Sequence, residues 1–175
     1  MSLSGIFNLL QRYAGGGASA AAATAPEDFE KVAQNANTSH IAEGLSHAFR
    51  SDQTPAFPEM LKGLFSQSDP QQRAGLLNEL LGSSSGAGGL GAIASFLPAG
   101  LSSLLQGGKQ VTPEQAQQIS PEAVQQLAEH AHQNNPSIVD TVSNFYSQHP
   151  GVVKTLGTGA LALIMAHMYE KQRSA

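Results

Sequence analysis

Helix-start signals recur along this chain, and they constrain its fold more than any other feature. A short polar residue stands directly before a proline at several places, which include Asp69-Pro70, Thr112-Pro113, Ser120-Pro121 and Asn135-Pro136. Such a residue can accept a hydrogen bond from the first helical turn, where proline is tolerated because that turn needs no N–H donor. Thr24 and Glu27 are also spaced as in a capping box. These signals predict helices that start near residues 26, 70, 113, 121 and 136.

Apolar residues follow these starts at helical spacing. Examples are Ile41, Leu45 and Phe49, then Leu76, Leu77, Leu80 and Leu81, then Ile138, Val142 and Phe145. No window alternates with the period of two that a half-buried strand requires. Aromatic residues make up only 6% of the chain and Trp is absent, so the core must use Leu, Ala, Val and Ile. We therefore predict an all-α fold, a compact bundle of short helices.

The two halves of the chain resemble each other, which suggests an internal repeat. PEDFEKVA at 26–33 resembles PEQAQQIS at 113–120. His47-Ala48 recurs as His130-Ala131 (130 − 47 = 83), and Ser66-Gln67 recurs as Ser147-Gln148 (147 − 66 = 81). We predict two related four-helix units. The alternative is a chance likeness between Ala- and Gln-rich helices with proline caps.

The chain thus divides into five predicted segments. They are an amphipathic helix at 1–14, a Gly/Ala linker at 15–25, a first helical unit at 26–82, a Gly/Ser-rich apolar connector at 83–110 and a second helical unit at 111–170. The connector carries too many apolar residues for a solvated linker, and we expect two short helical turns broken at Pro98. Its Gly86–Gly91 stretch matches GxGxxG, but no strand precedes it, so a dinucleotide site is not expected.

The N-terminal segment carries an apolar stripe. Leu3, Ile6, Phe7, Leu10 and Tyr13 fall at positions i, i+3, i+4, i+7 and i+10, which lie on one face of a helix. Such a face folds back onto the body, joins a neighbouring chain or lies on a membrane. Because the polar face offers only Arg12 and the terminal amine to anionic lipid, we favour docking with a partner helix. These five residues are the candidate interaction residues.

The stretch from Gly151 to Tyr169 is the most apolar in the chain. Small side chains recur along it at helical spacing, at Thr155, Gly159, Ala162 and Ala166, and such a stripe lets helix backbones approach closely. Lys154 and His167 interrupt the apolar surface. We predict a central core helix, with a dimer seam or membrane insertion as the alternatives.

Composition excludes several kinds of chemistry. The formal net charge of −4 repels phosphate backbones, so no nucleic-acid partner is expected. Without Cys, the chain has no disulfide, thiolate nucleophile or zinc finger. The motif HExxH is absent, and Glu27, Asp28, Glu114 and Glu122 lie where the helix dipole already accounts for them. We expect no catalytic residues, no metal and no cofactor; an enzyme or metal protein that uses His47, His130 and nearby carboxylates is the third alternative.

The N-terminus has no basic stretch before its apolar residues, and Asn8, Gln11 and Arg12 interrupt what would be the apolar region of a signal peptide. We therefore expect a cytoplasmic protein, with a pool peripheral to the membrane as the alternative.

The layout as a whole resembles the YidB-like group of small bacterial helical proteins. The resemblance rests on the apolar N-terminal helix, the Gly-rich middle and the proline-capped half VTPEQAQQISPEAVQQLAEHAHQNNPSIVDTVSNFYSQHPGVVKTLG; residues 52–81 have no counterpart in it. It implies a bacterial source and carries over no activity, cofactor or binding residue. We expect a non-enzymatic helical interaction or scaffold protein that binds a protein partner or itself, and peripheral membrane association is the alternative function.

Overall fold

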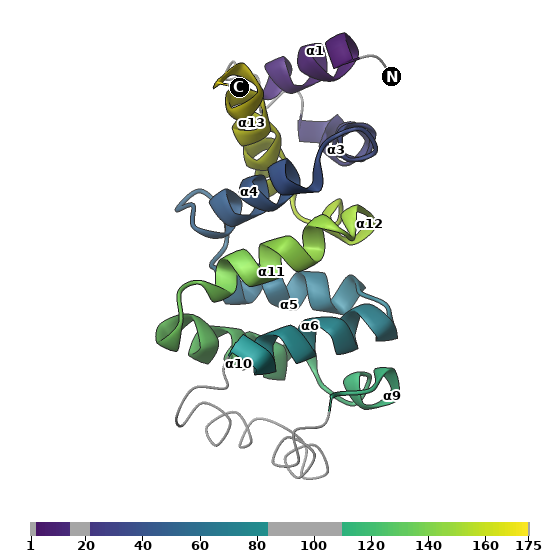
Figure 1. Cartoon of the computed structure of the whole chain (residues 1–175), viewed down its shortest axis with the longest axis vertical. Helices are drawn as coiled ribbons and strands as arrows, with labels where there is room; N and C mark the ends of the chain where they lie inside the picture. Colours follow the sequence, from purple (N-terminus) through teal and green to yellow (C-terminus); the bar gives the residue numbers. More distant parts are fainter. Residues whose placement is uncertain (1–2, 15–21, 84–109, 175) are drawn as a thin grey trace. The chain divides into compact units, whose positions relative to one another are not determined.

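The computed structural model confirms the all-α fold (Figure 1). It describes residues 3–14, 22–83 and 110–174, and no strand occurs in these ranges. The helices are α1 (Leu3–Ala14), η1 (Ala22–Thr24, a 3-10 helix), α3 (Ala25–Ala33), α4 (Thr38–Phe49), α5 (Phe57–Gln67), α6 (Pro70–Ser83), α9 (Pro113–Ala116), α10 (Pro121–Asn134), α11 (Ile138–Ser147), α12 (Pro150–Val153) and α13 (Thr158–Ser174). None of the helices in the described ranges is both long enough and apolar enough to cross a bilayer.

Most of the predicted helix starts have the expected caps. At α9 the Thr112 side chain accepts from the Gln115 N–H, and the Gln115 side chain accepts from the Thr112 N–H, which completes a capping box. Ser120 caps α10 by accepting from Ala123 N–H at 3.2 Å. These local hydrogen bonds explain why proline-marked boundaries could be placed from the sequence.

The predicted capping box at Thr24 is wrong. Thr24 has φ −100° and ψ 0°, whereas a capping residue normally has an extended backbone, and its side chain makes no cap hydrogen bond. Its hydroxyl instead donates to Asp28 Oδ2 at 3.0 Å. The preceding 3-10 helix, η1, leads directly into α3, so the last residues of the predicted 15–25 linker are helical.

The described chain forms two compact units. Unit 1 combines residues 1–56 with 143–175, and unit 2 consists of residues 57–142. The boundary falls within α11, between Val142 and Ser143. These spatial units divide the chain differently from the predicted segments 26–82 and 111–170, whose relation as repeats stays a prediction.

Helix α13 lies at the centre of the unit 1 core, where α1, α3 and α4 all contact it. Its buried side chains are Ala160, Leu161, Ala162, Ile164, Met165 and Met168. Buried residues of the helices that contact α13 include Ile6, Leu10, Phe29, Ile41 and Leu45. The core position predicted for the C-terminal segment holds for α13, but the continuous helix predicted from Gly151 is wrong: α12 ends at Val153 and α13 begins at Thr158, so Thr155 of the small-residue stripe lies between the two helices.

A close approach of α4 to α13 occurs at Gly44 of α4 and not at Gly159 of the small-residue stripe. A Cβ atom built on Gly44 would lie 2.9 Å from Ile164 Cγ2 and 3.1 Å from the Ile164 carbonyl oxygen. A Cβ atom on Gly159 would meet nothing within 4 Å. The missing side chain of Gly44 therefore lets α4 rest directly on α13.

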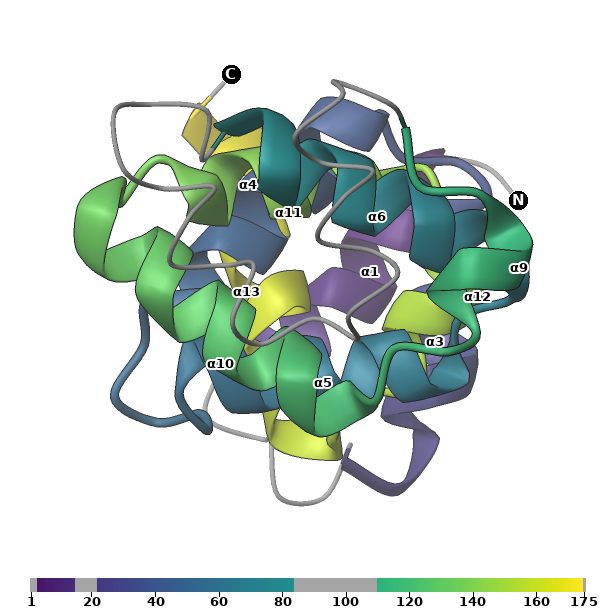
Figure 2. The same ribbon diagram turned by 90° about the horizontal axis from the view of Figure 1, so that it is seen from below.

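In unit 2, α5 packs against α10 and α6 against α9 (Figure 2). Phe57, Leu61, Leu64, Leu77 and Leu127 are among its buried residues. Asn78 of α6 joins α6 to the backbone before α9, because its amide donates to Val111 O at 3.2 Å and accepts from Val111 N–H at 2.8 Å. The predicted helical turns around Pro98 and the GxGxxG stretch at Gly86–Gly91 lie outside the described residues.

Candidate interaction site

Three of the five candidate interaction residues are buried within unit 1. Ile6, Leu10 and Tyr13 are 3%, 0% and 3% exposed, and α1 contacts both α13 and α3. Burial of these side chains stabilises the attachment of α1, since each apolar side chain removed from water contributes about 1.5–3 kcal/mol. Of the three arrangements considered for this helix, the structure shows the one in which it folds back. Leu3 belongs to α1, but its side chain lies outside the described part of the chain.

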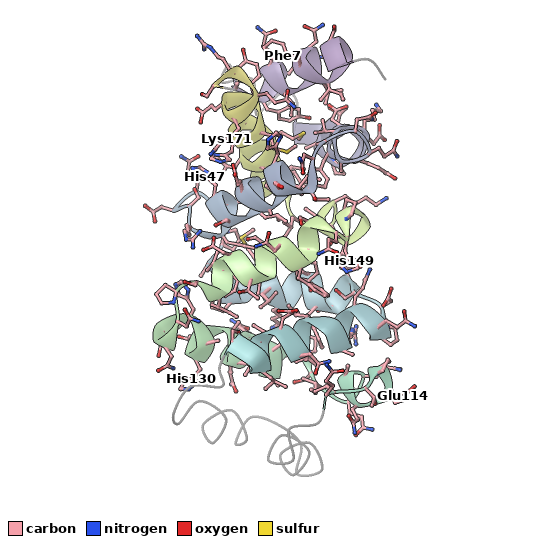
Figure 3. The ribbon with its side chains drawn as sticks, in the orientation of Figure 1. Phe7, His47, Glu114, His130, His149 and Lys171 are labelled. Atoms are coloured by element: carbon pink, nitrogen blue, oxygen red, sulfur yellow. The ribbon has the colours of Figure 1, made fainter. Side chains whose placement is uncertain are left out.

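Phe7 is the member of the stripe that remains accessible. Its side chain is 37% exposed, and it is the large apolar residue left exposed among those that the structure describes (Figure 3). Its ring lies against the half-buried ring of Tyr169 on α13, with centroids 5.0 Å apart and planes inclined by 42°. We call Phe7 and Tyr169 together the aromatic patch.

A buried hydrogen-bond network holds the C-terminal end of α1 in place. The Tyr13 hydroxyl donates to Asp28 Oδ2 at 2.9 Å, and the Thr24 hydroxyl donates to the same oxygen. Lys31 Nζ lies 3.7 Å from Asp28 Oδ1. Burial, followed by the hydrogen bond to Asp28, raises the pKa of Tyr13 to about 12. The network ties α1 to α3 and gives the buried carboxylate of Asp28 its partners.

Charged and imidazole groups line the junction of α4 and α13. Lys171 Nζ lies 3.1 Å from Glu43 Oε2 (Figure 3). The rings of His47 and His167 stack with centroids 4.7 Å apart. Burial lowers the pKa of His167 from its usual value, and the positive charges of His47 and Lys171 lower it further, against the opposing effect of Glu170 and Glu43.

These groups do not form a metal site. Within the described ranges no cluster of three or more His, Cys, Asp or Glu side chains is placed to hold an ion. The carboxylate of Glu43 is engaged by Lys171. His47 and His130 were considered together as residues of a metal site or enzyme. They belong to different units, since His47 lies in unit 1 and His130 in unit 2.

The sequence analysis missed Tyr169 and His167 as neighbours of the candidate residues. A weak signal was present: Glu43 and His47, like His167 and Lys171, are four residues apart and so share a helix face. Nothing in the sequence paired the two faces, because that pairing depends on how α4 packs on α13.

Comparison of the chain with protein-family models, with curated proteins and with solved structures finds no match.

Proposed function

We propose that this protein is a non-enzymatic helical interaction protein and that the aromatic patch is its contact point. The observation that carries the proposal is the exposure of Phe7 at 37% on a helix whose other described stripe residues are buried. Aromatic side chains are enriched at the energetic centres of interfaces, where they bury a large area at little entropic cost. The partner that fits is an apolar helix face, and a second copy of this chain is the partner that can be tested first.

Peripheral membrane association is less well supported by the same residues. An interfacial helix inserts its apolar face into the lipid boundary. In α1 that face includes Ile6, Leu10 and Tyr13, which are buried within unit 1. Membrane binding would therefore require α1 to leave α13, whereas a protein partner needs only the aromatic patch as it stands. Membership of the YidB-like group remains a proposal beside this one.

The test is the assembly state of the purified full chain, measured by light scattering on a size-exclusion column over a wide range of concentration. Phe7→Ser should reduce self-association because it removes the exposed ring while leaving the buried residues of α1 in place. Gln11→Ser is the matched control, since it changes an exposed polar residue of the same helix. If the wild-type chain and both variants have the same mass at every concentration, self-association through Phe7 is excluded.

A further inference from the structure

Each compact unit takes helices from both halves of the chain. Unit 2 joins α5 and α6 of the first half to α9 and α10 of the second. Unit 1 joins α3 and α4 of the first half to α12 and α13 of the second. Neither unit is therefore built from one half alone.

The buried residues of α4 and α10 fall at matching positions when the two helices are aligned at one fixed spacing. At the spacing of 83 residues (130 − 47), the buried residues Ile41, Leu45 and Ala48 correspond to the buried residues Val124, Ala128 and Ala131. Corresponding residues of these two helices thus face a core in each unit.

Helices α6 and α13, which contact α10 and α4 respectively, also correspond. At a spacing of 84 (160 − 76), Leu76, Leu77, Leu80 and Leu81 of α6 correspond to Ala160, Leu161, Ile164 and Met165 of α13, and all eight are buried. At a spacing of 81 (138 − 57), Phe57, Leu61 and Phe65 of α5 correspond to Ile138, Val142 and Tyr146 of α11, and all six are buried.

The contacts of these two helices repeat as well. Helix α13 contacts α3 and α4, and the corresponding helix α6 contacts α9 and α10. The two contacts differ at one informative position, because Gly44 of α4 corresponds to Leu127 of α10 (127 − 44 = 83). Gly44 permits the close approach of α4 to Ile164. The corresponding place of α10 holds the buried side chain of Leu127.

From this correspondence we infer that the chain is two fused copies of one helical repeat whose parts are exchanged. The first helices of each copy, α3–α4 or α9–α10, dock on the last helices of the other copy. The buried faces of α4 and α10 are then equivalent interaction surfaces, and the partner that each fits is the closing helix of a second repeat. This inference is independent of the aromatic patch.

The test is to cut the full chain between the copies. A protease site inserted within residues 84–109 allows cleavage of the purified, folded protein. If the parts are exchanged, the two fragments co-elute at the mass of the intact chain and retain its helical circular dichroism. Their melting temperature becomes dependent on concentration, because unfolding now separates two molecules. Fragments that elute separately as helical species, or that lose their helical signal, would overturn the inference.

Equivalent substitutions sharpen the test. Leu80→Asp and Ile164→Asp each place a charge in a surface between the two fragments, so each should weaken their association by at least about tenfold. Gln67→Asp and Gln148→Asp are the controls, because they are exposed and correspond at a spacing of 81 (148 − 67). Unchanged association in both core variants would contradict the exchange of parts.

Discussion

The imidazole rings of His47 and His167 stack across α4 and α13, with centroids 4.7 Å apart and planes inclined by only 18°. Protonation of both rings would place two positive charges in contact, near Lys171. Burial and these charges lower the pKa of His167 in the folded protein below its usual value of 6.5, while the unfolded chain retains that value. The folded state therefore binds fewer protons than the unfolded state as pH falls through 6.5 towards the lowered pKa.

Stability should thus be full above pH 6.5 and fall as the solution is acidified through the pKa of His167. Urea unfolding measured at a series of pH values gives the slope. His167→Gln should flatten this slope in the region around pH 6.5, because glutamine does not titrate. His130→Gln, which removes a histidine of unit 2 outside the stacked pair, is the comparison. An unchanged slope for His167→Gln would show that the stacked pair does not control the pH response.

Gly44→Ala should destabilise the protein by about 1–3 kcal/mol, because the new Cβ atom meets the side chain and carbonyl of Ile164. The matched control is Gly63→Ala in α5, where a Cβ atom meets nothing within 4 Å. That substitution should be stabilising by about 0.5–1 kcal/mol, since alanine favours the helix. Chemical denaturation compares the two variants, and equal effects would contradict the close approach of α4 and α13.

Tyr13→Phe should lower the free energy of unfolding by about 1–3 kcal/mol, because it removes a hydrogen bond to the buried carboxylate of Asp28. Tyr169→Phe removes a hydroxyl from a half-buried ring and should cost less. Urea denaturation of both variants separates the effects. Equal losses would mean that the Tyr13–Asp28 bond contributes nothing particular to the attachment of α1.

Asn78→Ala should destabilise unit 2, because it removes the side chain that pairs with both backbone groups of Val111. A loss of about 1–3 kcal/mol is expected where partly buried backbone groups lose their partners. Asn35→Ala, which removes an exposed bond to the Lys31 carbonyl, serves as the control. Hydrogen exchange of the Val111 amide reports the effect directly: its protection should fall in Asn78→Ala and persist in Asn35→Ala.

Helix positions could be predicted from the sequence because their signals are local. The capping box joins Thr112 to Gln115, three residues later, so both residues can be recognised directly in the sequence. The same spacing at Thr24 and Glu27 predicted a capping box that does not form, because the backbone enters α3 from a 3-10 helix. A pattern of side chains is therefore insufficient where the preceding backbone is not extended.

The candidate site was less predictable, since its contacts join residues far apart in the chain. The apolar stripe of α1 was visible, but which of its members would remain exposed depended on the packing against α13. Phe7 meets Tyr169, and His47 meets His167, across more than 100 residues of sequence (169 − 7 = 162; 167 − 47 = 120). Helical spacing identifies the faces of single helices and gives no information on which faces meet.

The discontinuity of unit 1 also sets the order in which the protein can mature during synthesis. Between the end of α4 at Phe49 and the start of α13 at Thr158, the ribosome must add a further 109 residues (158 − 49). At typical elongation rates this takes roughly 5–20 s. Unit 2 lies wholly within that interval and can close while translation continues. The apolar face of α4 has to wait, because the helix that covers it, α13, is made last.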